Sequence, residues 1–158
     1  MTSEPRNIAL AIFERLRASF PRLTMTIDHH PEEGIDLSLD IPEQDGLLFD
    51  VALNLQNHDE LHLCAAGLWS SWFPCTDPKL AEALFEAASG LLLGHLRILE
   101  HWRGTSLAKA ELQRPEGDSW KTIYTSGPYS SEPFLSFPWS RKRLNVVQLR
   151  VVQNVRSE

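Results

Sequence analysis

A strict alternation of apolar and polar side chains constrains this sequence more than any other feature. In residues 34–41 and 47–56 every odd position is apolar and most even positions are polar. Successive side chains of a strand point to opposite faces of a sheet, so this period of two is typical of half-buried strands. The link between them, residues 42–46, is short and rich in turn residues. We therefore predict that the two segments form an antiparallel pair.

Weaker alternation marks the other predicted strands. Residues 22–28 and 60–66 continue the pattern, and in the second of these His62 and Cys64 fall on the polar, solvated side. Turn residues separate the later segments from one another. These later strands are predicted at about 96–102, 106–113, 119–125 and 143–154.

Two segments have the three- and four-residue spacing of an amphipathic helix. The first is residues 5–19, with a proline suited to the first turn. The second is residues 77–93, where the run Thr76, Asp77, Pro78 supplies a capping oxygen and a proline suited to the first helical turn. We expect both helices to bury their apolar stripe on a core.

Together these elements predict an α+β protein in which residues 1–158 form a single domain. A chain of 158 residues is long enough for one well-buried core. Hairpin connections and one-sided strands favour a single curved antiparallel β-sheet of about seven or eight strands, with two α-helices packed on one face. The order of elements loosely resembles that of secretion chaperones and toxin-immunity proteins, which are small bacterial binding domains.

Two aromatic segments have neither helical nor strand periodicity, and we predict both as loops. One surrounds Trp69–Cys75, and the other is residues 126–140, which is rich in proline and serine. Large rings either cover a core or form an apolar binding surface. The binding interpretation takes as its candidate residues Trp69, Trp72, Phe73, Cys75 and Trp139.

Cys75 also carries an alternative, catalytic interpretation. It comes just before a predicted helix, whose free amides and dipole favour an anion and can lower the pKa of a thiol. A nucleophile needs a base as well, for which His95 and His101 are candidates. This pattern would suit a small enzyme or ligand-binding protein with a pocket on the sheet. The competing interpretation makes Cys75 a small buried residue beside Trp72.

The sequence favours no cofactor and no metal. His58 and His62 have the spacing of a zinc-protease helix, but Asp59 stands where that motif needs glutamate. On a strand, ligands at these positions are spread too far apart for one ion. Phosphate loops, dinucleotide-binding glycine motifs, serine-hydrolase elbows and paired CxxC motifs are also absent from the sequence.

Charge is distributed unevenly along the chain. Residues 1–100 hold 6 basic and 16 acidic side chains, whereas residues 101–158 hold 9 and 5, and the net charge is −6. Acidic surfaces are repelled by phosphate backbones, so a nucleic-acid role would depend on the basic cluster at residues 141–143, and we do not expect one. No apolar run is long enough to span a membrane, and the amino end lacks the layout of an export signal.

We therefore expect a small cytoplasmic bacterial binding or interaction module without catalytic activity, chaperone-like or immunity-like in its partner binding. Two cysteines without a pairing motif fit a reducing compartment. The expected partner is a protein or a second copy of the chain, and a small-molecule ligand is the alternative.

Overall fold

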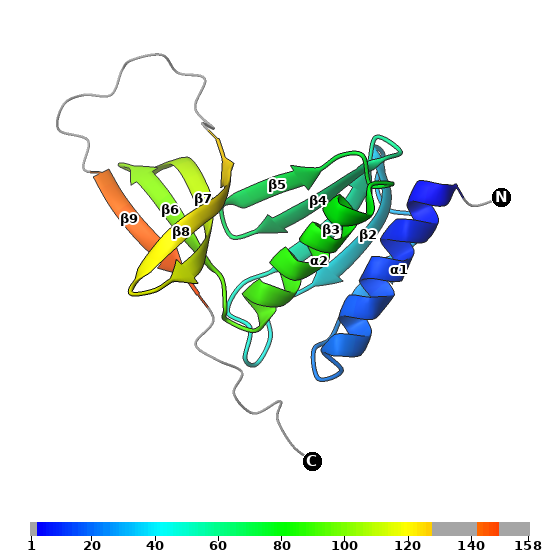
Figure 1. The fold of residues 1–158 in the computed structure, drawn as a ribbon, viewed down its shortest axis with the longest axis horizontal. Helices are drawn as coiled ribbons and strands as arrows, with labels where there is room; N and C mark the ends of the chain where they lie inside the picture. Colours follow the sequence, from blue (N-terminus) through cyan, green and yellow to red (C-terminus); the bar gives the residue numbers. More distant parts are fainter. Residues whose placement is uncertain (1–2, 128–141, 149–158) are drawn as a thin grey trace.

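The computed structural model describes residues 3–127 and 142–148. In these residues two helices and two antiparallel sheets form an α+β fold, which confirms the predicted class (Figure 1). The expected single sheet is wrong in detail, because the strands divide into a five-stranded and a four-stranded sheet. The helices are α1 (Glu4–Ser19) and α2 (Pro78–Leu92).

The first sheet is a meander in which each strand pairs with its neighbour in the chain. Its spatial order is β1 (Thr26–Asp28), β2 (Ile35–Ile41), β3 (Val51–Gln56), β4 (Glu60–Ala65) and β5 (Leu68–Trp72). β1 and β3 are shorter than predicted. A turn closed by backbone hydrogen bonds between Gln44 and Leu47 delays the start of β3 to Val51.

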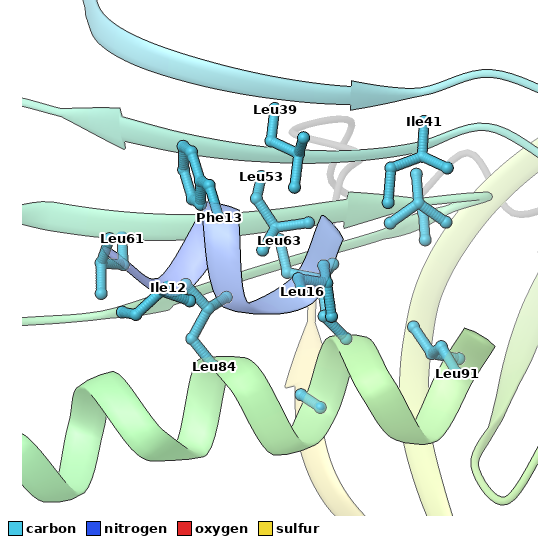
Figure 2. Packing of buried hydrophobic residues seen from close by; sticks show 14 of the residues in the cluster. Ile12, Phe13, Leu16, Leu39, Ile41, Leu53, Leu61, Leu63, Leu84 and Leu91 are labelled. Atoms are coloured by element: carbon cyan, nitrogen blue, oxygen red, sulfur yellow. The ribbon is translucent and has the colours of Figure 1, made fainter. Parts of the chain in front are cut away.

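The core lies between this sheet and the two helices. Leu39 pairs with Leu53, and Leu53 pairs with Leu63, so one apolar row crosses three strands. Figure 2 shows Phe13 of α1 and Leu84 of α2 approaching this row from the helical side. All five side chains are completely buried. The odd positions therefore face the helices, as the alternation predicts.

A side-chain cap marks the start of α2, whereas Ser3 before α1 makes no such hydrogen bond. Asp77 accepts a hydrogen bond from the backbone N–H of Lys79 at 2.9 Å, and Pro78 occupies the first turn of α2. The two helices contact each other through Arg15, whose guanidinium bonds Glu82 at 2.6 Å and lies over the ring of Phe85.

The second sheet has the order β8, β7, β6, β9 (Figure 1). It contacts β5, the edge strand of the first sheet, through β7 and β8. The predicted strand at 143–154 is described only as β9, and its remainder lies outside the described residues, as does nearly all of the loop predicted at 126–140. The strands are β6 (Arg97–Arg103), β7 (Ser106–Glu116), β8 (Ser119–Ser126) and β9 (Lys142–Val147).

A buried carboxylate joins the two sheets. Glu100 of β6 is only 5% exposed and accepts hydrogen bonds from the backbone of Gly67 at 2.9 Å, from Trp102 at 3.0 Å and from Asn145 at 2.9 Å. A Cβ on Gly67 would lie 2.5 Å from Leu107. A larger residue at position 67 would therefore require the side chains of Leu107 and Glu100 to shift.

The segment around Trp69 is a strand, so the loop predicted there is wrong for residues 68–72. Leu68, Ser70 and Trp72 are buried, whereas Trp69 and Ser71 are exposed. The period of two is regular in the structure. It was hidden in the sequence because each face of β5 carries both a tryptophan and a serine.

In the part of the chain that the structure describes, no helix is long and apolar enough to cross a membrane.

We expect Leu84→Ala to lower the free energy of unfolding by about 2–5 kcal/mol, because it empties space at the centre of the core. Leu48 offers a matched control, since its side chain is 75% exposed and Leu48→Ala should change stability by less than about 0.5 kcal/mol. Urea denaturation of both variants measures the difference. Equal effects would show that Leu84 does not belong to the core.

Candidate functional site

Two aromatic side chains stand exposed at the edge of the first sheet, and we call them the aromatic surface. Trp69 of β5 is 53% exposed, and Phe73, which follows the strand by one residue, is 63% exposed. Both were predicted as binding residues. Large exposed rings at an edge are unusual, because apolar surface of this kind is normally covered.

Trp69 is held in place from two sides. Its indole N–H donates a hydrogen bond to Nδ1 of His62 at 2.8 Å, and the two ring centroids lie 5.7 Å apart. Its backbone N–H donates to the hydroxyl of Ser126 at 3.2 Å. The exposed ring is therefore preorganised, and a partner would lose little side-chain entropy in binding it.

His62 lies on the polar face of the sheet, as predicted, but it is not solvated. It is 5% exposed because Trp69 packs against it. Since Nδ1 accepts a hydrogen bond, the neutral ring carries its proton on Nε2, which lies 3.3 Å from a carboxylate oxygen of Glu60 without hydrogen-bond geometry. Burial lowers the pKa of His62, and this effect outweighs the opposing influence of Glu60.

One acidic side chain lies on the strand next to these rings, and two more lie further across the sheet on β2. Glu60 lies beside His62, and Asp36 accepts a hydrogen bond from the backbone of His58 at 2.9 Å. Asp40 of β2 accepts one from the hydroxyl of Ser38 at 3.2 Å. No group of three or more histidine, cysteine, aspartate or glutamate side chains among the described residues is arranged to hold a metal ion.

Trp72 does not belong to the aromatic surface. It is 3% exposed, its indole N–H donates to the hydroxyl of Tyr124 at 3.0 Å, and the two rings meet edge to face with centroids 4.9 Å apart. Trp72 therefore fastens β5 to the second sheet. Trp139, the remaining aromatic candidate, lies outside the described residues.

Cys75 is also buried, and its environment opposes an activated thiolate. Burial first, and then Asp59, raise the pKa of Cys75 to about 12, which is opposite to the direction expected from the helix dipole. Its backbone N–H donates to the side chain of Asp59 at 2.9 Å, and its Sγ lies 3.9 Å from the carbonyl oxygen of Pro5. The geometry fits the interpretation of Cys75 as a small buried residue.

The proposed bases lie elsewhere. His101 of β6 contacts Glu111 at 2.6 Å, and His95 lines a cleft between α2 and the second sheet. A second cavity, of about 430 Å³, opens near the carboxyl ends of the helices, where Phe20 and Leu92 form part of its wall. Cys75 lines neither cavity.

Sequence reasoning missed three residues of this region: His62 as a buried partner of Trp69, and Glu100 and Tyr124 as contacts between the sheets. The contact between His62 and Trp69 could have been predicted, since a tight turn at residues 66–67 places positions 62 and 69 on adjacent strands. The other two depend on how the second sheet meets β5, which no periodicity encodes.

The residues that the structure describes therefore form an α+β protein with two exposed rings at a sheet edge, of which Trp69 is held by hydrogen bonds. Among these residues no hydrogen bond joins a histidine to Cys75. No protein-family model, no curated protein and no solved structure matches the chain.

We expect His62 to titrate below its ordinary pKa of about 6.5. The folded protein holds the ring neutral, whereas the unfolded chain binds a proton near that pH. Unfolding therefore takes up a proton, and stability falls as the pH falls below about 6.5. Ring-proton NMR gives the midpoint, and urea denaturation at several pH values gives the stability. His62→Gln should remove this contribution.

His58→Gln serves as the control for that measurement, since the His58 side chain is 94% exposed. It should leave the measured titration midpoint of His62 unchanged. A His62 midpoint at or above the free value would contradict its burial beneath Trp69.

We expect the Cys75 thiol to resist alkylation in the folded protein. In a Cys64→Ser variant, iodoacetamide should react slowly at neutral pH, with a pH midpoint above that of free cysteine, because the pKa of Cys75 is raised to about 12. Urea should restore rapid reaction. Fast modification of the folded variant at neutral pH would contradict the buried position.

Proposed function

We propose that this protein is a non-catalytic binding module that takes up a protein partner on the aromatic surface of Trp69 and Phe73. The observation that carries the proposal is the exposure of both rings, 53% and 63%, within five residues at a sheet edge. Aromatic side chains dominate the binding energy of protein interfaces, because they bury large areas at small entropic cost.

The charge around the rings indicates the chemistry of the partner. Glu60 belongs to β4, the strand next to β5, whereas Asp36 and Asp40 belong to β2, which β3 and β4 separate from β5. The whole of residues 1–100 carries 16 acidic against 6 basic side chains. Complementary potentials steer association and exclude partners of like charge. A basic segment with apolar side chains therefore fits this surface best.

The alternative of a catalytic or ligand-binding pocket that uses Cys75 and a histidine has less support. The thiol is buried, and burial raises its pKa. Two free cysteines fit a reducing compartment such as a bacterial cytoplasm, which we include in the proposal. A second copy of the chain is a further partner to be considered, and sedimentation analysis would detect it.

The test uses three synthetic peptides of twelve residues that alternate leucine with lysine, with glutamine or with glutamate. Tryptophan fluorescence and calorimetry measure their binding. We expect the lysine peptide to bind best, and binding to weaken with added salt because exposed charges are screened. Trp69→Ala and Phe73→Ala should each weaken it about tenfold or more, the effect of losing an interface hot spot.

Leu48→Ala is the matched control, because it removes an exposed apolar side chain from a different part of the molecule and should leave peptide binding unchanged. Circular dichroism checks that each variant is folded. Equal binding of the three peptides, or full binding by both aromatic variants, would refute the proposal.

A further inference from the structure

A second candidate site lies in the cleft between α2 and the second sheet, away from the aromatic surface. The cleft has a volume of about 380 Å³, within the range of small-molecule sites. Figure 1 shows the carboxyl end of α2 beside the second sheet. Ala83 and Ala87 of α2 and Ile123 of β8 provide apolar walls.

The sheet side of the cleft carries a positive charge that is not neutralised. Arg114 of β7 lines the cleft, and no hydrogen bond or ion pair joins its side chain to any residue in 3–127 or 142–148. The register places Arg114 directly across from Lys121 of β8. The ammonium of Lys121 lies 4.0 Å from a carboxylate oxygen of Glu116, so Arg114 is the cation of this pair that is left available to an anion.

Tyr124 adds a hydrogen-bond donor to the same cleft. Its hydroxyl oxygen accepts the indole N–H of the buried Trp72 at 3.0 Å. A tyrosine hydroxyl has one hydrogen, and this contact leaves that hydrogen free to donate. No residue in the described parts of the chain accepts that hydrogen. The hydroxyl is thus held by a core residue and can serve a ligand oxygen.

The helix side of the cleft carries a negative charge. Glu86 of α2 lines it, and His95 lies where the chain leaves the helix. Glu86 can accept a hydrogen bond from a hydroxyl or amino group, but it repels an anion. A ligand with one anionic end would therefore place that end toward Arg114 rather than toward Glu86.

We propose that this cleft binds a small organic anion. A carboxylate or phosphate group pairs with Arg114 and accepts the hydrogen of Tyr124, and a compact apolar body lies against Ala83, Ala87 and Ile123. Arginine suits this role because its planar fork matches both carboxylate and phosphate oxygens.

The test titrates the full chain with 3-phenylpropionate and with phenyl phosphate, and follows binding by two-dimensional NMR and calorimetry. The neutral analogue 3-phenylpropanol reports the contribution of the apolar body alone. We expect saturable binding of at least one anion, with shifts at Tyr124 and Ile123, and binding of the alcohol at least tenfold weaker. The better of the two anions identifies a carboxylate or a phosphate as the preferred group.

Arg114→Gln should weaken anion binding tenfold or more. Because the Arg114 side chain is exposed, we expect this variant to remain folded. Lys109→Gln is the matched control, because Lys109 is a cation on the same strand whose contact is with Glu111. Tyr124→Phe should also weaken binding, in a protein shown to be folded by circular dichroism. Absence of saturable binding, equal binding of the alcohol, or unchanged binding by Arg114→Gln would overturn the proposal.

Discussion

The apolar layer between the first sheet and the two helices determines the placement of everything else. Leu53 lies at its centre, and the strands on either side present their odd positions to it. In β5 the inward positions are Leu68 and Trp72, so Trp69 must point away from the helices. A slip of one residue would exchange the two tryptophans, because a strand has a period of two. The exposed aromatic pair is therefore a consequence of core packing.

The contact between the sheets connects the two candidate sites. Trp72 is buried between them and bonds Tyr124, which lines the cleft beside α2. On the same strand the backbone of Trp69 bonds Ser126, which ends β8. One short strand thus supports the aromatic surface and one wall of the cleft. A ligand in the cleft and a partner on the rings would contact the same rigid element.

The sequence was sufficient where local pattern decides structure. The alternation identified β2 and β3, and the capping oxygen and proline within residues 76–78 identified α2, each to within a few residues. The pattern failed at β5, where tryptophan and serine occur on both faces. It also could not reveal two sheets in place of one, because that division depends on contacts such as Glu100 with Gly67.

Cys75 shows why the sequence could not predict the chemistry of the site. A helix dipole at an exposed position is worth about 0.3–1 kcal/mol, less than one pKa unit. Burial of a thiolate costs more, and the raised pKa of Cys75 shows that burial prevails. Local sequence reveals a nearby helix start, but the depth of a side chain is a property of the whole fold.

The strand order also bears on how the chain acquires its structure during synthesis. β1 to β5 pair strictly with their chain neighbours, so the first sheet needs only contacts between adjacent segments, which form quickly. β6, by contrast, lies between β7 and β9, and residues 127–141 separate β9 from β8. During synthesis the first sheet can therefore form before β9 has been made. Until β9 pairs with β6, one edge of β6 is unpaired, and an unpaired edge is prone to aggregation. A chaperone would be of most use at that stage.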